Sequence, residues 1–214
     1  MEASCSRHVK TIHMKINNLK VAVIGAGVIG AGWAARFAEN GINVSVYDPA
    51  PDAERKAAAV LENADRACAK LTMAPRASKG KVDFVESIRT AVEDAGLIVE
   101  AVPEEVVIKK STYAEIEKTA AVDAIIASST SGILPSLLQE GMNHPRRLLV
   151  AHPFNPVYLL PLVELVGGKD TAVDVIDRAS KIYSAIGMRP LHIKKEIEAF
   201  VADRLMEAVW RESL

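Results

Sequence analysis

The sequence predicts an α/β protein with a doubly wound, mostly parallel sheet, and three observations lead to this fold class. Short apolar runs rich in Val and Ile alternate with longer stretches of helical spacing along most of the 214 residues. These runs have the length and the lack of polar alternation that are typical of strands buried on both faces. A glycine-rich turn joins the first run to the first helical stretch. This alternation favours a parallel sheet with helices on both sides.

The first strand, turn and helix lie around Lys20–Gly32, which reads KVAVIGAGVIGAG. The turn has the pattern Gly-x-Gly-x-x-Gly and consists of Gly25, Ala26, Gly27, Val28, Ile29 and Gly30. In this context Gly25 allows a tight turn, Gly27 lets the backbone approach a pyrophosphate, and Gly30 lets helix and strand pack closely. Free N–H groups at the helix N-terminus attract phosphates. The stretch therefore predicts a dinucleotide site.

An acidic residue ends the second expected strand. Asp48 follows Asn43–Tyr47 at the distance from the glycines where a carboxylate hydrogen-bonds the adenosine ribose. The carboxylate would repel a 2′-phosphate, and the following Pro49–Pro51 segment supplies no cation. We therefore expect NAD rather than NADP as the cofactor.

The other elements are predicted from apolar periodicity. The expected strands are Val21–Ile24, Asn43–Tyr47, Val82–Val85, Leu97–Val102, Ala124–Ala127, Leu148–Ala151, Val163–Val166 and Arg189–Ile193. The expected helices are Ala31–Asn40, Asp52–Leu71, Ile88–Ala95, Glu104–Ala120, Pro135–Glu140, Thr171–Ile186 and Glu196–Leu214. Ligands of such sheets bind across the carboxyl ends of the strands, so the polar residues there are the candidate site. These are Asp48, Glu100, Ser128–Ser131 and His152.

Composition excludes several partners and sites. The formal net charge of -1 gives no field for nucleic acid, and no apolar run approaches the length of a membrane span. Cys5 and Cys68 form no disulfide framework, which fits a cytoplasmic location. We expect no metal site, and His8 and His13 are expected to be solvated. Residues 1–18 are polar and aperiodic, and we assign them as an N-terminal extension.

A second informative stretch is Ala151–Gly168, which reads AHPFNPVYLLPLVELVGG. His152 follows an apolar strand, and Glu164 lies inside an otherwise apolar run. A carboxylate in such a run is costly unless it is paired, and a histidine is a suitable partner. Together they would make a general base and its orienting group. From spacing alone, a buried structural histidine and a surface glutamate are equally compatible.

From Leu19 onward the chain resembles the 3-hydroxyacyl-CoA dehydrogenase family. The HPFNP motif at His152–Pro156 and the acid Glu164 are similar to that family's catalytic dyad. The resemblance implies that the histidine takes the hydroxyl proton while a hydride passes to NAD. It also assigns Ser131 to the substrate oxygen. Less closely, it places Glu105 and Lys110 beside the nicotinamide end of the cofactor, although Lys110 is equally compatible with a solvated helix position.

The chain departs from the family's acyl-CoA members at two places. Ser129-Thr130-Ser131 stands where they carry Asn-Thr-Ser, and Asp203 stands where they carry a substrate-side asparagine. An acid suits a cationic substrate. The stretches HPFNPVYLLPLVELVGG and AFVADRLMEAVWRE are similar to the branch of the family that oxidises L-carnitine. A quaternary ammonium is held by aromatic faces and carboxylates. Phe154, Tyr158, Trp210 and Asp203 are candidates, with core packing and a helix N-terminal acid as the alternative reading.

The resemblance also implies the domain organisation. We expect an NAD-binding domain over 19–194 and, over 195–214, the incomplete start of an all-α domain that would form a homodimer. Phe200, Leu205 and Val209 are expected on the apolar side of this last helix. The competing functions are a short-chain 3-hydroxyacyl-CoA dehydrogenase, an L-gulonate-type 3-dehydrogenase, and a non-catalytic NAD-binding protein. A truncated chain of this kind is expected to keep cofactor binding better than turnover.

Overall fold

The computed structural model describes residues 19–71 and 78–214. The extension over 1–18, with Cys5, His8 and His13, lies outside the described residues. The strands are β1 Val21–Ile24, β2 Val44–Tyr47, β3 Val82–Phe84, β4 Leu97–Glu100, β5 Ile125–Ser128, β6 Leu148–Pro153, β7 Leu162–Gly167 and β8 Arg189–Ile193. The helices are α1 Val28–Glu39, α2 Ala53–Leu71, α3 Ile88–Val92, α4 Val106–Ile116, α5 Pro135–Gln139, α6 Val173–Ala185, α7 Ala202–Glu212 and the short 3₁₀ helix η1 Pro145–Arg147.

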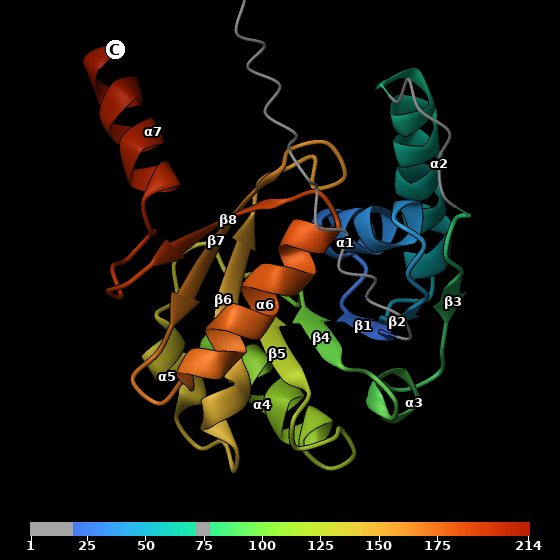
Figure 1. Cartoon of the computed structure of the whole chain (residues 1–214), viewed down its shortest axis with the longest axis horizontal. Coiled ribbons are helices and arrows are strands. Elements are labelled where there is room, and N and C mark those ends of the chain that lie inside the picture. The colour runs from blue at the N-terminus through green and yellow to red at the C-terminus, as the bar shows by residue number, and fades with distance from the viewer. Residues whose placement is uncertain (1–18, 72–77) are drawn as a thin grey trace, which may run out of the picture.

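The strands form one eight-stranded sheet in the order β3-β2-β1-β4-β5-β6-β7-β8 (Figure 1). All neighbours are parallel except β6 and β7, which are antiparallel. The order reverses direction between β1 and β4, and the crevice at such a reversal is where dinucleotides bind. The predicted doubly wound sheet is confirmed.

Two apolar cores cover the two faces of the sheet. Alternate strand residues such as Val23 and Val99 pack with α1, α2 and α6. Their neighbours, such as Ile24 and Ile98, pack with α3, α4 and α5. Because both faces are covered, the central strands are apolar without alternation, as their sequences predicted.

Strand parity places the polar strand residues on one face. Glu100, Ser128, His152 and Glu164 alternate with residues of the first core, so their side chains point to the face of α4 and α5. All four are buried. The candidate site is therefore built on a single side of the sheet, at the carboxyl ends of β4, β5 and β6.

The last helix is shorter than predicted. The structure begins α7 at Ala202, whereas the sequence predicted one helix from Glu196. Ala199 and Phe200 precede it with φ values of 57° and 49°, in the left-handed region that interrupts a helix. The placement of Phe200 on the apolar face of the helix is wrong, because its side chain is buried in the second core. Leu205 and Val209 do lie on α7, and both are exposed.

Within the described residues, no helix is both long and apolar enough to span a bilayer.

Candidate active site

The glycine turn has the geometry that each glycine was expected to provide. Gly25 adopts φ 97°, and a Cβ there would lie 2.5 Å from the Ala101 carbonyl oxygen. A Cβ at Gly30 would lie 1.8 Å from the Gly25 oxygen, so this glycine permits the close contact of α1 with the turn. A Cβ at Gly27 would meet nothing within 4 Å. Gly27 therefore borders open space at the N-terminus of α1, where a diphosphate can approach the backbone.

Val28 and Ile29 form the first turn of α1 behind Gly27. Val28 is exposed, and the N–H groups of a first turn have no acceptor within their own helix. No side chain caps this helix. The free donors and the positive end of the helix dipole are thus available to an anion.

Asp48 lies beside this turn at the end of β2. Its carboxylate accepts hydrogen bonds from the backbone N–H groups of Ala26, at 2.7 Å, and Ala50, at 2.8 Å. These bonds hold the carboxylate next to the glycine turn. The open cradle at Gly27 and the acid at the neighbouring strand end fit a dinucleotide with an unphosphorylated adenosine ribose.

His152 and Glu164 face each other across the antiparallel pair β6–β7. They are direct partners in the ladder, and directly opposite residues project to the same face of a sheet. His152 Nδ1 lies 2.9 Å from Glu164 Oε2. The Glu164 side chain is fully buried and that of His152 is 6% exposed. The carboxylate therefore favours the imidazole tautomer with a proton on Nδ1, which leaves Nε2 as a potential base.

Aromatic rings and a second carboxylate surround the imidazole. The ring centroid of Phe154 lies 4.8 Å from that of His152, and the ring centroid of Phe200 lies 5.5 Å from that of His152. Asp203, in the first turn of α7, places Oδ2 3.8 Å from His152 Nε2. This distance is too long for a hydrogen bond, so Asp203 contributes negative charge beside Nε2 without occupying its lone pair.

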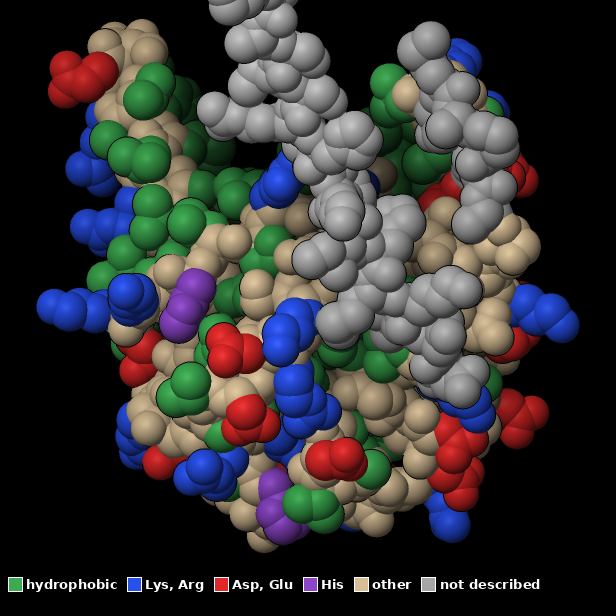
Figure 2. Space-filling model, in the orientation of Figure 1, with side chains coloured by type: hydrophobic (Ala, Val, Ile, Leu, Met, Phe, Trp, Pro, Cys, Tyr) green, Lys and Arg blue, Asp and Glu red, His purple; other side chains and the backbone are tan. Residues whose placement is uncertain are grey.

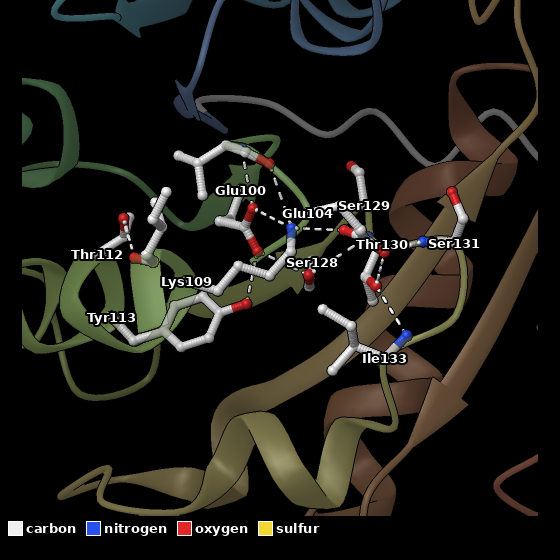
Figure 3. A network of polar contacts seen from close by, with 12 residues as sticks. Glu100, Glu104, Lys109, Thr112, Tyr113, Ser128, Ser129, Thr130, Ser131 and Ile133 are labelled. Atoms are coloured by element: carbon white, nitrogen blue, oxygen red, sulfur yellow. Dashed lines mark hydrogen bonds and ion pairs between the residues drawn. The ribbon is translucent and has the colours of Figure 1, made fainter. Parts of the chain in front are cut away.

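A buried polar network lies at the carboxyl ends of β4 and β5 (Figure 3). Glu100 accepts hydrogen bonds from Lys109 Nζ at 2.8 Å, Tyr113 Oη at 2.5 Å and Ser128 Oγ at 2.7 Å. Burial, together with the Glu100 carboxylate, raises the pKa of the Tyr113 phenol well above its usual value. These contacts give the buried Glu100 and Lys109 partners of opposite charge and anchor α4 to the sheet.

Glu104 connects this network to the Ser128–Ser131 loop. Its Oε2 lies 3.2 Å from Lys109 Nζ, and its Oε1 accepts the Thr130 hydroxyl and, at 2.9 Å, the Ser131 N–H. Burial acts to raise the pKa of Glu104, but the Thr130 hydroxyl, the Lys109 charge and the Ser131 N–H together lower it. Glu104 is thus an ionised group at the carboxyl ends of the strands, with its side chain 48% exposed.

Comparison with protein-family profiles gives the family of the chain. The profile described as "3-hydroxyacyl-CoA dehydrogenase, NAD binding domain" matches residues 20–197.

The chain belongs to this family.

Two curated relatives are similar to this chain over most of its length. The chain is 57% identical over 182 residues to the L-carnitine dehydrogenase/betainyl-CoA thioesterase of a Rhizobium species. It is 55% identical over 183 residues to the L-carnitine dehydrogenase of Oceanobacillus iheyensis. These matches cover 85% and 86% of this chain but 37% and 60% of those proteins. The chain thus spans about a third to three fifths of the length of these relatives.

Two solved structures have a similar fold. A 5-formyl-3-hydroxy-2-methylpyridine 4-carboxylic acid 5-dehydrogenase, described as an NAD⁺-dependent dismutase, has a TM-score of 0.85 at 36% identity. It covers 90% of this chain and 63% of its own. The 3-hydroxybutyryl-CoA dehydrogenase of Escherichia coli K12 has a TM-score of 0.79 at 25% identity, over 90% of this chain and 42% of its own. The expected family and its NAD cofactor are confirmed.

The structure distinguishes two Glu–Lys pairs of equal spacing that the sequence alone does not separate. The expected pair Glu105 and Lys110 lies outside the network, since Lys110 Nζ pairs with Glu140 at 2.9 Å and Glu105 is exposed at the N-terminus of α4. The adjacent pair, Glu104 and Lys109, has the same spacing and lies within the network. Sequence reasoning missed this pair.

The remaining substrate-side candidates fall into two groups. Ser131 and Phe154 lie at the site, Ser131 through its N–H bond to Glu104 and Phe154 through its ring contact with His152. Tyr158 is half-buried, and its backbone carbonyl accepts a hydrogen bond from Arg36, whereas its ring is not among those that contact His152 in the described residues. Trp210 is 62% exposed on α7.

Among the described residues, no group of three or more His, Cys, Asp or Glu side chains is arranged to hold a metal ion.

Proposed function

We propose that this chain is the NAD-binding part of an enzyme that oxidises the 3-hydroxyl of L-carnitine to 3-dehydrocarnitine. The observation that carries the proposal is the position of His152. Its Nδ1 is held by Glu164, and its Nε2 faces Asp203 without a hydrogen-bond partner among the described residues. The relatives named L-carnitine dehydrogenase support the same substrate.

In the proposed reaction, His152 Nε2 accepts the proton of the substrate hydroxyl. Glu164 stabilises the imidazolium that forms, because its carboxylate already accepts the Nδ1 proton. NAD supplies the acceptor for the hydride that leaves the carbinol carbon. Ser131 is proposed to hydrogen-bond the substrate oxygen. A base of this kind contributes about 10²–10⁴-fold to the rate.

Asp203 is the proposed determinant of substrate charge. The quaternary nitrogen of carnitine is separated from the carbinol carbon by a single methylene group. A hydroxyl bound to His152 Nε2 therefore brings the cation close to the Asp203 carboxylate, which lies 3.8 Å from Nε2. Phe154, beside the imidazole, offers an aromatic face that can attract the same cation. A neutral thioester gains nothing from this carboxylate.

The test follows NADH absorbance in parallel assays of NAD with L-carnitine, D-carnitine, 3-hydroxybutyryl-CoA and L-gulonate. In the whole enzyme, of which this chain is the proposed NAD-binding part, we expect turnover with L-carnitine and none with the other three compounds. His152→Gln should remove turnover and leave NADH binding near the wild-type value. Activity with the CoA ester and none with carnitine would contradict the proposal, and loss of NADH binding in His152→Gln would indicate a structural histidine.

The proposal includes a preference for NAD over NADP that depends on Asp48. Its carboxylate lies beside the glycine turn, held by the Ala26 and Ala50 N–H groups. Asp48→Asn keeps the shape of the side chain but removes the charge that repels a 2′-phosphate. We expect the ratio of NADPH to NADH affinity, measured by fluorescence titration, to rise about tenfold or more, which corresponds to ~1.4 kcal/mol. An unchanged ratio would mean that the acid does not reach the ribose.

We further propose that the enzyme is a homodimer. Hydrophobic side chains gather along α7, at the upper left of Figure 2. Leu205, Met206, Val209 and Trp210 are each more than 60% exposed there. An apolar surface of this kind is typical of an interaction site. Sedimentation velocity should give the mass of a dimer, and Leu205→Glu should lower it to that of a monomer.

A further inference from the structure

The segment between β8 and α7, residues 196–202, touches three parts of the candidate site. Glu196 accepts hydrogen bonds from the Ser136 N–H, at 2.6 Å, and hydroxyl, at 2.5 Å, which fixes the start of the segment to α5. A Cβ added at Gly132 would lie 3.7 Å from the Ala199 nitrogen, so the segment is in contact with the loop that carries Ser131. The remaining contacts reach His152 and Glu164.

The backbone of this segment has an unusual conformation. Ala199 and Phe200 are the two residues other than glycine with positive φ among the described residues, at 57° and 49°. The left-handed region is disfavoured for residues with a Cβ, and such residues cluster where the surrounding structure holds them for a purpose. Here the turn positions two groups: the backbone N–H groups of Val201 and Ala202, and the ring of Phe200.

The segment holds the Glu164 carboxylate from the side opposite to the histidine contact. Glu164 Oε1 accepts the N–H of Val201 at 3.1 Å and the N–H of Ala202 at 2.9 Å. Its Oε2 is 2.9 Å from His152 Nδ1. The first amides of α7 therefore fix the carboxylate that orients the imidazole, and the left-handed turn aims those amides at it.

The ring of Phe200 acts on the other member of the pair. It is fully buried, and its centroid lies 5.5 Å from that of the imidazole at an interplanar angle of 49°. Rotation of the His152 ring would bring it against the ring of Phe200. One short segment thus constrains both the base and its orienting acid.

We propose that Phe200 is a positioning residue for His152, held against the imidazole by the left-handed turn at Ala199 and Phe200. The role rests on the proposed function, because it matters for catalysis only if His152 is the base. Phe200 touches no reacting atom in this account. It acts by restricting His152 to the orientation in which Nδ1 meets Glu164 and Nε2 faces the substrate side.

The test uses ¹⁵N NMR of the histidine side chains, with His152 assigned by the signals that are missing in His152→Gln. In the wild-type chain we expect one tautomer, protonated on Nδ1, with a slowly exchanging proton. Phe200→Leu removes the ring and keeps an apolar side chain. We expect its His152 signals to move toward those of a mixture of tautomers, and the exchange rate of the Nδ1 proton to rise about tenfold or more.

Phe37→Leu is the matched control. Phe37 is equally buried, but its ring contacts are with Trp33 and Tyr183 in the other core. This variant should lose stability by a similar amount and keep the wild-type His152 signals. The proposal is overturned if Phe200→Leu has wild-type His152 signals and exchange, or if Phe37→Leu alters them equally. If Phe200→Leu does not fold, Phe200→Met replaces it, since a flexible Met fills the site without a ring.

This measurement needs no substrate, so its outcome is separate from that of the carnitine assay. Failure of carnitine turnover with the expected NMR changes would contradict the proposed function alone. Where turnover is measured, Phe200→Leu should lower kcat about tenfold and leave KM nearly unchanged, because the variant disturbs the alignment of the base and not the substrate contacts.

Discussion

Replacing glycines in the turn after β1 separates cofactor binding from folding. A Cβ at Gly27 would meet no heavy atom within 4 Å, and the backbone there has φ -63°, which alanine adopts freely. A Cβ at Gly30 would lie 1.8 Å from the Gly25 carbonyl oxygen. Gly27→Ala therefore places a methyl group in the open space of the cofactor cradle, whereas Gly30→Ala places one inside the fold.

The magnitudes follow from these distances. In Gly27→Ala, the reduced entropy of the unfolded chain stabilises by about 0.4–1 kcal/mol, and the poorer N-cap residue offsets it. The free energy of unfolding should stay within about 1 kcal/mol of the wild type. The affinity for NADH should fall about tenfold or more, or ~1.4 kcal/mol. In Gly30→Ala, backbone atoms must move by about 1 Å or more, at a cost of about 3 kcal/mol or more.

Two measurements on both variants test this reasoning. Urea unfolding without cofactor gives the free energy of unfolding, and fluorescence titration gives the affinity for NADH. We expect loss of binding without loss of stability in Gly27→Ala and loss of stability in Gly30→Ala. A well-folded Gly27→Ala that binds NADH as tightly as the wild type would show that the pyrophosphate does not lie over Gly27.

Two further predictions concern the polar network. Because the pKa of Glu104 is lowered in the fold, this carboxylate adds stability above its unfolded pKa of about 4.3, and the contribution disappears as the pH falls through the folded pKa. Thr130→Val removes the hydroxyl that donates to Glu104. The loss in free energy of unfolding, measured with urea, should therefore be larger at pH 7 than at about pH 3. An equal loss at both pH values would refute the lowered pKa of Glu104. Lys109→Met leaves the Glu100 carboxylate without its buried cation and should cost about 3–5 kcal/mol, whereas Lys110→Met breaks an exposed pair and should cost about 1 kcal/mol or less. Similar losses in the two lysine variants would contradict the burial of Lys109.

The strands and the glycine turn could be predicted because their causes are local. A run such as Val21–Ile24 is apolar at every position, which only burial on both faces explains. Gly25 and Gly30 are required by close backbone contacts within one strand–turn–helix unit. These features need no knowledge of distant segments, and the structure has them at the predicted positions.

The candidate site could be proposed only in part from the sequence, for physical reasons. Glu104–Lys109 and Glu105–Lys110 have the same spacing, so the sequence does not reveal which pair faces the sheet. The facing pair is decided by the Glu100 carboxylate, which contacts Lys109. The left-handed turn at Ala199 and Phe200 carries neither glycine nor asparagine, the residues that usually mark it. Its position depends on tertiary contacts with Glu164.

The cross-strand pairing of His152 with Glu164 has a consequence for how this domain can diversify. Their distance is set by the ladder between β6 and β7 and not by residues 154–161, which connect the two strands. Substitutions in the connecting loop, outside the buried Val157, can therefore reshape the surface beside His152 while the acid and the imidazole stay in register. One residue inserted within either strand would instead turn one partner to the opposite face of the sheet. New substrate preferences are thus accessible through the loop, whereas the chemistry is tied to the strands.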